Sequence, residues 1–351
     1  MPDPTTPGRL AELTTLRVGG PAEQLVRATD EAALIAAVAE ADRAGRDVLL
    51  VAGGSNLLVA DEGVASLVVQ VASSGVEATD DDTAVLVTVQ AGETWDDFVA
   101  HCVAEGWSGV EALSGIPGSV GATPIQNVGA YGQEVAATVA EVRVWDRREQ
   151  EVRRLSGAAC AFGYRHSRFK ADPTGFVVLA VTFRLERDPL GQPVRYGELA
   201  RTLGVDAGGR APLADVRRAV LGLRAGKGMV LDEADHDTWS AGSFFTNPVL
   251  QPAAAAALPD DVPRYEQADG SVKTSAAWLI EHAGFAKGFA LPTDAATPPA
   301  SLSTKHTLAL TNRGTATAAD LLALARHVRA GVDRCFGVRL VNEPVLVNCS
   351  L

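Results

Sequence analysis

Three polar side chains in this 351-residue sequence stand in settings that suit chemistry: Arg165, Ser243 and Glu343. Arg165 lies in the segment FGYRHSRFK, directly after Tyr164 and between two phenylalanines. A guanidinium in such a setting suits bidentate binding of a carboxylate. An ordinary solvated turn with an aromatic anchor is the alternative, and both interpretations stay open at this point.

Ser243 lies in SAGSFFTNP, which places a hydroxyl in a loop bordered by two phenylalanines. The nucleophile elbow GxSxG needs glycine two places to each side, and those places hold Ala241 and Phe245. None of the six histidines has a local context that marks it as the base of a catalytic triad. A serine that donates a proton and a serine that only caps a turn both remain open.

Glu343, in VNEPV, stands between apolar residues and beside Pro344. A carboxylate in apolar surroundings is costly unless it is paired or held for a reaction. The sequence therefore predicts either a pairing role at the end of a strand or a chemical role for this residue.

A glycine-rich stretch, residues 113–132 (LSGIPGSVGATPIQNVGAYG), is the segment that other elements must position. Its glycines and two prolines oppose a regular helix, and it is too apolar for a solvated linker. Glycines remove Cβ atoms where a ligand would approach, and the exposed N–H groups can face phosphate or ring heteroatoms. We expect a large cofactor here, with Gln126, Asn127 and Tyr131 set among the glycines; a complicated turn between strands is the alternative.

A second glycine-containing loop follows an apolar run at residues 47–52 (DVLLVA) that is typical of a buried parallel strand. Residues 28–44 before it form a helix that Thr29 or Asp30 can cap. The loop itself reads Gly-Gly-Ser-Asn-Leu from position 53, and its bare amides suit a diphosphate. A GxGxxG fingerprint is missing, so a standard Rossmann site is not expected.

The remaining elements read as an α+β protein. Strands are expected at 15–21, 67–71, 84–90, 140–146, 151–155, 177–185 and 338–340. Helices are expected at 94–106, capped by Thr94, and at 213–224, 275–283 and 317–334.

Composition narrows the class of protein. A net charge of -12 and a pI near 5.0 argue against non-specific binding of nucleic acid. The four cysteines are scattered without a CxxC pair, which fits a reducing cytosol and argues against a disulfide framework or a zinc site. No secretory h-region or membrane-spanning stretch is found, so a cytoplasmic protein without a metal or membrane partner is expected.

Taken together, GGSNLL, GIPGSVGATPIQNVGAYG, YRHSRFK, AGSFFTNP and NEPV resemble the UDP-N-acetylenolpyruvoylglucosamine reductases of peptidoglycan synthesis, the MurB family. The resemblance runs from about residue 15 to the C-terminus. It implies one non-covalent FAD in a two-part N-terminal region of the vanillyl-alcohol-oxidase type, and a C-terminal α+β domain for the substrate. It also implies hydride transfer from NADPH to N5 of FAD and then to UDP-N-acetylglucosamine enolpyruvate, giving UDP-N-acetylmuramate.

The resemblance also implies roles for individual residues. Arg165 would hold the substrate carboxylate, Ser243 would protonate the carbon next to it, and Glu343 would assist beside the developing enolate. The residues expected to line FAD are Gly53, Gly54, Ser55, Asn56, Leu57, Gly115, Ile116, Pro117, Gly118, Ser119, Gly121, Gln126 and Asn127. Those expected to contact substrate are Tyr164, Tyr196, Lys227, Asn247 and Lys273.

One of these positions, Tyr196, depends on the subtype of the family. PVRYGELAR resembles the extra segment of a tyrosine-bearing type I subclass, in which Tyr196 would contact the UDP part of the substrate. From the residues alone, Tyr196 could lie in an ordinary loop and Lys227 could simply be solvated. A glutamine common in the family stands here as His282.

The expected domains are residues 1–72 and 73–221 for FAD and 222–351 for substrate, with the C-terminal strand able to pack back on the first. Two rival functions remain. One is an oxidase or dehydrogenase for another substrate on the same flavin scaffold, which would not need Ser243, Asn247 and Glu343 together. The other is a non-catalytic binding module for a flavin or UDP-sugar, which need not keep Arg165, Ser243 and Glu343.

Overall fold

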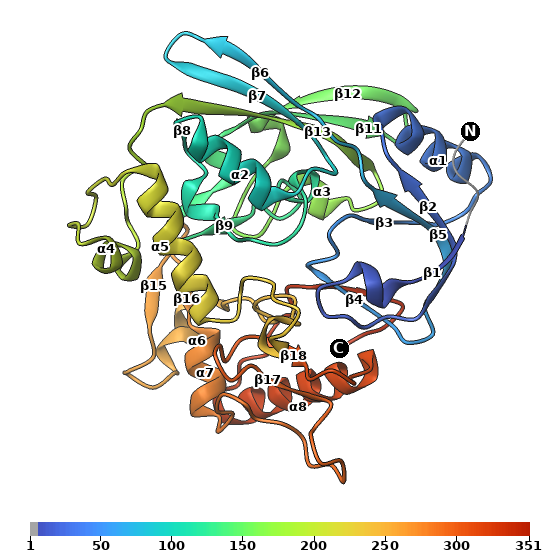
Figure 1. Ribbon diagram of the computed structural model, residues 1–351. Coiled ribbons are helices and arrows are strands. Elements are labelled where there is room, and N and C mark those ends of the chain that lie inside the picture. The colour runs from blue at the N-terminus through green and yellow to red at the C-terminus, as the bar shows by residue number, and fades with distance from the viewer. Residues whose placement is uncertain (1–5) are drawn as a thin grey trace. The chain divides into compact units, whose positions relative to one another are not determined.

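The computed structural model describes residues 6–351, and the chain divides into two compact units (Figure 1). Of the described residues, unit 1 comprises residues 6–8, Ala22–Gly53 and Ala65–Ala225. Unit 2 comprises Arg9–Pro21, Gly54–Val64 and Gly226–Leu351, so it draws two short pieces from the N-terminal part of the chain. The expected three-part division at residues 72 and 221 stays a prediction.

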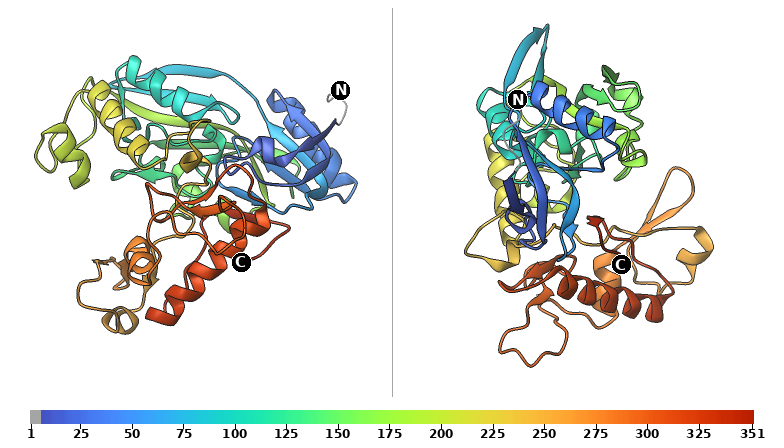
Figure 2. Two further views of the ribbon diagram at one scale, coloured as in Figure 1. Left: turned by 60° about the horizontal axis from the view of Figure 1, so that its bottom comes forward. Right: turned by 90° about the vertical axis from the view of Figure 1, so that its right-hand side faces the viewer.

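A six-stranded antiparallel sheet forms the centre of unit 1, in the order β12-β11-β13-β7-β6, with β8 also paired to β13. Its strands are β6 (Val76–Asp81), β7 (Ala84–Gln90), β8 (Trp107–Ser108), β11 (Val139–Asp146), β12 (Glu151–Ser156) and β13 (Phe176–Arg187). The predicted strands at 84–90, 140–146, 151–155 and 177–185 are confirmed. The β6–β7 hairpin extends beyond the rest of this sheet (Figures 1 and 2).

A smaller four-stranded sheet of order β1-β2-β5-β3 carries the first predicted helix. It consists of β1 (Thr6–Arg9), β2 (Pro21–Ala28), β3 (Val48–Val51) and β5 (Val64–Val71). Strand β3 runs parallel to β5, as its apolar run predicted. Helix α1 (Glu31–Arg43) begins after Asp30, whose side chain accepts a hydrogen bond from the Ala33 N–H at 2.8 Å.

Helix α2 (Trp95–Ala104) packs its apolar face on the large sheet. Trp95, Phe98 and Phe183 meet there with ring centroids 5.1–5.8 Å apart, and all three are buried. Thr94 stands at the predicted cap position, but its side chain makes no capping hydrogen bond. The helix start is instead bound by the glycine-rich stretch described below.

Three helices and a two-stranded ladder complete unit 1. These are α3 (Arg168–Ala171), α4 (Gly197–Leu203), α5 (Leu213–Gly226), β9 (Gly129–Ala130) and β10 (Gln133–Glu134). Within this unit α4 lies at the opposite end from α1, as both Figure 1 and the left view of Figure 2 show.

Unit 2 is built on one apolar core around the long helix α8 (Ala318–Phe336). Thr317 and Asp320 form a capping box at the start of α8, and Gly337 ends it in a left-handed conformation. The other elements are β4 (Leu57–Val59), β14 (Val249–Leu250), α6 (Pro252–Ala256), β15 (Arg264–Glu266), β16 (Val272–Thr274), α7 (Ala276–His282), β17 (Ala300–Leu302), β18 (Leu310–Asn312) and β19 (Val345–Val347). The C-terminal strand β19 pairs in parallel with β4 from the N-terminal part of the chain.

Two expected strands are wrong. Residues 15–20 form a turn at 15–16 followed by irregular backbone, with Arg17 in a left-handed conformation, and the strand begins only at Pro21. Leu16 and Val18 are buried in the core of unit 2, so their alternation reflects insertion of the turn. Val338 and Leu340 are buried around an exposed Arg339, but among residues 6–351 this segment has no ladder partner and forms no strand.

Among residues 6–351, none of the helices combines the length and the apolar character needed to cross a membrane.

Candidate active site

The two predicted glycine loops meet at Gly53 and Gly118. A Cβ placed on Gly53 would lie 2.8 Å from the Cα of Gly118, a distance that real side chains do not tolerate. The two backbones therefore touch where neither residue carries a side chain. Gly118 has φ +117° and the neighbouring Gly54 has φ +54°, which are conformations that glycine adopts at low cost.

Residues 118–121 of the glycine-rich stretch are bound by backbone hydrogen bonds to the start of α2 and to the segment between β7 and α2. The Trp95 N–H donates to Gly118 O at 3.0 Å, and the Gly121 N–H donates to Ala91 O at 2.9 Å. A Cβ on Gly121 would lie 2.5 Å from the Cβ of Ala91. The stretch contains no α-helix, as its composition predicted, and it is buried or half-buried over most of its length.

A carboxylate on α2 anchors the same stretch. Asp96 Oδ1 accepts the Gly115 N–H at 2.5 Å, and Arg217 from α5 donates to both Asp96 oxygens at 2.6 and 2.9 Å. Burial raises the pKa of Asp96, but the Arg217 and Gly115 hydrogen bonds and the nearby positive charges outweigh it and leave the pKa below its usual value. Asp96 is thus an anion that fixes the conformation of Gly115. It was not predicted from the sequence, because a helical Asp reads as a solvated first-turn residue.

Ser119 is the polar side chain of this stretch that the protein leaves unsatisfied. Its Oγ is buried and makes no hydrogen bond to any of the described residues. An unsatisfied buried hydroxyl costs about 1–3 kcal/mol. A bound group with a polar atom would remove that cost. Gly118, which precedes it, and Ile116 and Pro117 before that are half-buried.

Asn127 has a structural position in the same stretch. Its Nδ2 donates to Glu134 Oε2 at 2.7 Å and to Gly163 O at 3.1 Å, and its Oδ1 accepts the Ala136 N–H at 3.0 Å. These bonds use both Nδ2 hydrogens and the oxygen. Asn127 can therefore serve a ligand through the loop that it holds. Gln126 beside it is half-buried.

Arg165 stands on a tight turn that the glycine-rich stretch holds in place. Gly163 and His166 exchange backbone hydrogen bonds of 3.0 and 3.2 Å, and Arg165 between them has φ +49°. Its Nη2 donates to Gly129 O at 3.1 Å, and its guanidinium carbon lies 5.7 Å from the centre of the Tyr164 ring. The turn is also pinned by Ser167, whose Oγ donates to Ile125 O at 2.5 Å.

Tyr196 lies beside the end of the same stretch. Its ring meets Tyr131 edge to face, with centroids 5.4 Å apart, and 44% of the residue is exposed. The segment that leads to it is held by Glu111, a fully buried carboxylate that accepts the Gln192 N–H at 2.6 Å and Gln133 Nε2 at 2.8 Å. Tyr164, Arg165 and Tyr196 thus all border one glycine-rich stretch within unit 1.

In unit 2 the fold brings Ser243 and Glu343 together, although they are 100 residues apart in the chain. The Glu343 N–H donates to the carbonyl of Phe244, the residue after Ser243, at 2.8 Å. Phe245 and Asn342 form an isolated bridge beside it. Phe244 and Phe245 are buried at 1% exposure, and they hold this segment in the apolar core.

The remainder of the GGSNL loop reaches the same place from the N-terminal part of the chain. Asn56 Nδ2 donates to Glu343 O at 3.3 Å, and the Val345 N–H donates to Asn56 O at 2.9 Å. These bonds continue into the β4–β19 ladder, in which Leu57 faces Val345. Ser55 and Asn56 are half-buried, and Gly54 packs against Leu13, whose carbonyl oxygen would lie 1.7 Å from an added Cβ.

His306 is a member of the site that was not predicted from the sequence. Its Nε2 lies 3.4 Å from Ser243 Oγ, at the outer limit of a hydrogen bond, and both residues are half-buried. The Phe244 N–H donates to Leu308 O at 2.8 Å, which joins the serine segment to the loop that carries the histidine. The signal in the sequence was a histidine in a polar loop between two short apolar runs, and nothing local linked it to Ser243.

The other predicted substrate residues of unit 2 fall in two places. Asn247 Oδ1 accepts the Ala276 N–H at 3.0 Å at the start of α7, and Lys273 lies on the neighbouring strand β16, opposite Val249. Lys227 follows α5 and is half-buried. His282 is exposed and stacks on Trp278 with ring centroids 3.6 Å apart.

Comparison with known proteins places this arrangement in a class. A model of FAD binding domains matches residues 22–156, and a model of the UDP-N-acetylenolpyruvoylglucosamine reductase C-terminal domain matches residues 233–347. With the mixed helices and strands of both units, these matches confirm the expected fold class. The protein is an α+β flavin-binding oxidoreductase with an N-terminal FAD-binding region and a C-terminal domain of the reductase type.

Full-length relatives narrow the class to a family. UDP-N-acetylenolpyruvoylglucosamine reductase of Thermobifida fusca is 58% identical over 97% of both chains, and that of Streptomyces avermitilis is 56% identical over 97% of this chain and 94% of its own. The crystal structure of MurB from Thermus caldophilus is similar with a TM-score of 0.66 and 26% identity, covering 98% of each chain. The chain belongs to the UDP-N-acetylenolpyruvoylglucosamine reductase family, the FAD-dependent oxidoreductases of peptidoglycan synthesis.

Proposed function

We propose that this chain reduces the enolpyruvyl ether of UDP-N-acetylglucosamine enolpyruvate to UDP-N-acetylmuramate, with NADPH as reductant, in the cytoplasm. The observation that supports the proposal is a junction of three segments far apart in sequence: the Phe244 carbonyl, next to Ser243, accepts the Glu343 N–H, and the Asn56 side chain donates to the Glu343 carbonyl. A flavin-binding module without catalysis would not need Ser243 and Glu343 on adjoining segments.

The residues present fit FAD. Two glycine loops meet without side chains at Gly53 and Gly118, and the buried Ser119 hydroxyl has no hydrogen-bond partner among the described residues. Gly54, Ser55, Asn56 and Leu57 would hold the diphosphate, and the 115–121 segment with Gln126 would border the ring system. Bound FAD supplies the redox chemistry, carrying a hydride from NADPH to the substrate.

The residues of the chain have to bind the substrate carboxylate and supply a proton. Addition of a hydride to the methylene carbon of the enolpyruvyl group leaves an electron pair on the carbon next to the carboxylate. Arg165 would bind that carboxylate, and Ser243 Oγ would donate the proton to the carbon, forming the C–H bond as its O–H bond breaks. A neutral serine is a weak acid, so Glu343 and His306 would set its orientation and its field.

The remaining residues would bind the nucleotide sugar. Lys227 and Lys273 carry positive charge suited to a diphosphate, Asn247 carries a side-chain amide whose oxygen binds the start of α7, and Tyr164 and Tyr196 have exposed rings. Tyr196 lies next to Tyr131 on an exposed segment, which is where a residue that contacts substrate from the outside belongs.

Anaerobic stopped-flow absorbance at the flavin band tests the proposal in two mixes. NADPH added to the oxidised holoenzyme should bleach the band, and UDP-N-acetylglucosamine enolpyruvate added to the reduced holoenzyme should restore it. Bleaching without recovery would keep a flavin oxidoreductase but reject this substrate. A purified protein that cannot be loaded with FAD would reject the whole proposal.

Ser243→Ala separates the proposed role of the serine from a folding role. The variant should bleach with NADPH as the parent does, whereas recovery by substrate should slow by about 10²–10⁴-fold, the usual contribution of a positioned acid. Equal loss of both steps would make Ser243 a binding or folding residue.

A further inference from the structure

The loop that carries His306 is the connection between β17 and β18, and it is fixed from within by Ser303. The Ser303 N–H donates to Ala309 O at 2.8 Å and closes the loop. The buried Ser303 Oγ then accepts the Lys305 N–H at 3.0 Å and the His306 N–H at 3.2 Å. The backbone of His306 therefore has its direction set by a side chain three residues earlier.

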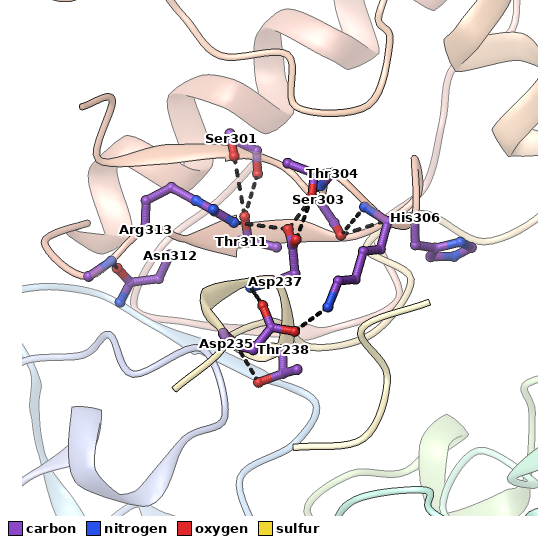
Figure 3. Close-up of polar contacts among 12 residues, drawn as sticks. Asp235, Asp237, Thr238, Ser301, Ser303, Thr304, His306, Thr311, Asn312 and Arg313 are labelled. Atoms are coloured by element: carbon purple, nitrogen blue, oxygen red, sulfur yellow. Dashed lines mark hydrogen bonds and ion pairs between the residues drawn. The ribbon is translucent and has the colours of Figure 1, made fainter. Parts of the chain in front are cut away.

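The same loop is held from outside by Asp237, which lies on the turn around residues 236–238 (Figure 3). Asp237 Oδ1 accepts the Thr304 N–H at 2.9 Å, and Oδ2 accepts the Thr304 hydroxyl at 2.5 Å. The carboxylate thus binds both donors of one loop residue. Asp237 is 4% exposed, so little water competes for these bonds.

Asp237 is held as an anion by the groups that face it. Arg313, just after β18, donates to Asp237 Oδ1 at 2.9 Å. Burial raises the pKa of Asp237, but hydrogen bonds from Thr304 and Ser303 and the charge of Arg313 outweigh it and leave the pKa below its usual value. An anion accepts stronger hydrogen bonds than a neutral group, which makes this a firm attachment.

A second carboxylate supports the turn that presents Asp237. Asp235 Oδ1 accepts the Asp237 N–H at 3.0 Å, and Asp235 Oδ2 accepts Lys305 Nζ at 2.5 Å. On its other side, the Asp237 carbonyl oxygen would lie 3.1 Å from a Cβ added to Gly228, the residue after Lys227. Asp237 therefore connects the loop of His306 to the chain that follows Lys227.

We propose that Asp237 is a positioning residue for the proton-donating end of the site, holding the 303–306 loop through Thr304 so that His306 stays beside Ser243; this inference rests on the function proposed above. Asp237 touches neither substrate nor cofactor in this role. Its effect passes through Thr304, the loop and the imidazole to the serine hydroxyl.

Kinetics of the loop variants test the catalytic part. Thr304→Val keeps the side-chain shape but removes the hydroxyl that Asp237 binds, and Thr304→Ser restores it. Thr304→Val and Asp237→Asn should slow recovery of the flavin band by substrate about 10- to 100-fold, as small misplacements of catalytic groups do, with bleaching by NADPH little changed. Thr304→Ser should recover the parental rate. Asp61→Asn, which alters a carboxylate bound to the Ala318 and Ala319 N–H groups at the start of α8, is the matched control in the same unit.

Histidine side-chain NMR of the FAD-loaded protein tests the positioning part without relying on activity. In the parent, Ser243→Ala should shift the His306 imidazole signal, because the two side chains are 3.4 Å apart. In the Thr304→Val and Asp237→Asn backgrounds, Ser243→Ala should no longer shift the His306 signal. In the Thr304→Ser and Asp61→Asn backgrounds, the shift should be preserved.

The outcomes separate the inference from the proposed function. If the parent is not reoxidised by the enolpyruvyl substrate, the proposed function fails, and the NMR response alone decides whether Asp237 positions His306. If Asp237→Asn does not fold, the Thr304 pair decides. An unchanged His306 response in Thr304→Val, or equal slowing of bleaching and recovery in that variant, would overturn the inference.

Discussion

The Oγ of Ser243 and the Nε2 of His306 lie 3.4 Å apart, although 63 residues separate them in the chain. Two backbone hydrogen bonds hold the segment of Ser243 between the loop that carries His306 and the segment that carries Glu343. The Phe244 N–H donates to Leu308 O, and the Phe244 carbonyl accepts the Glu343 N–H, both at 2.8 Å. The Ser243 hydroxyl therefore lies next to His306 from the first of these segments, and the second segment carries Glu343.

Substitution of His306 should therefore act on the step that consumes the serine proton. His306→Gln removes the imidazole but keeps a polar side chain, and recovery of the flavin band by substrate should slow about 10- to 100-fold, below the full effect of a general acid. Anaerobic stopped-flow over a range of pH measures the rate of this recovery. His101→Gln, on an exposed histidine of α2, is the control and should match the parent. A His306→Gln rate equal to that of the parent would remove the histidine from the mechanism.

Arg165→Lys should weaken binding of the enolpyruvyl substrate, since an ammonium cannot reproduce the two parallel N–H donors of a guanidinium. Loss of about 1.5–3 kcal/mol of charged hydrogen bonding corresponds to a KM about 10- to 100-fold higher. NADPH-driven bleaching should not change. The control is Arg168→Lys, three residues along on helix α3, where the arginine is exposed. If both variants raise KM equally, the effect is one of net charge.

Glycine substitutions test the contact of backbone with backbone at the cofactor loops. Gly121→Ala would place a methyl group 2.5 Å from the Cβ of Ala91, and overpacking of this kind costs about 1–3 kcal/mol. The midpoint of thermal unfolding and FAD retention during gel filtration should both fall. Gly53→Ala should act in the same direction through Gly118.

At Gly222, on the exposed side of α5, a glycine-to-alanine substitution is expected to stabilise the protein instead. Nothing lies within 4 Å of a Cβ there, so Gly222→Ala should raise stability by about 0.5–1 kcal/mol through helix propensity. Thermal unfolding of both variants, with the FAD content matched, makes the comparison. Equal destabilisation at the two positions would contradict the packing argument.

Asp96→Asn should destabilise unit 1 and loosen Gly115, by about 1.5–3 kcal/mol for the charged hydrogen bonds lost. Because the pKa of Asp96 in the folded protein is lowered, beside Arg217 and Arg224, its contribution is complete above the ordinary carboxyl pKa. It is lost as pH falls through the lowered value. The difference in unfolding midpoint between parent and variant should thus be full at neutral pH and shrink in acid.

Asp97→Asn provides the matched control for that experiment, because it changes a neighbouring carboxylate in the same helical turn. Its midpoint should follow the parent at every pH. A gap between the parent and Asp96→Asn that stays constant into acid would contradict the assignment of an ionised Asp96.

Elements with a clear period or a clear cap were predictable. Helix α1 was indicated by its apolar spacing and by Asp30, which does cap it. The conformation of the segment with Leu16 and Val18 was not predictable. Alternating apolar residues show only that every second side chain is buried, and this also holds for a turn that inserts into a core.

The residues of the candidate site also fall into those that local sequence indicates and those that only the tertiary structure reveals. The residue types and local spacing in the chain marked Arg165, Ser243, Glu343 and the two glycine loops as candidates, because each stands in a short segment whose composition is unusual for a solvated loop; their roles stay predictions. His306, Asp237 and Asp96 were hidden, because their importance comes from partners between 19 and 121 residues away. Those pairings exist only after the chain closes its β17–β18 loop against the serine segment and docks the glycine-rich stretch on α2. Local preferences of a sequence report neighbours along the chain, whereas a hydrogen bond between distant residues depends on the packing of the whole unit.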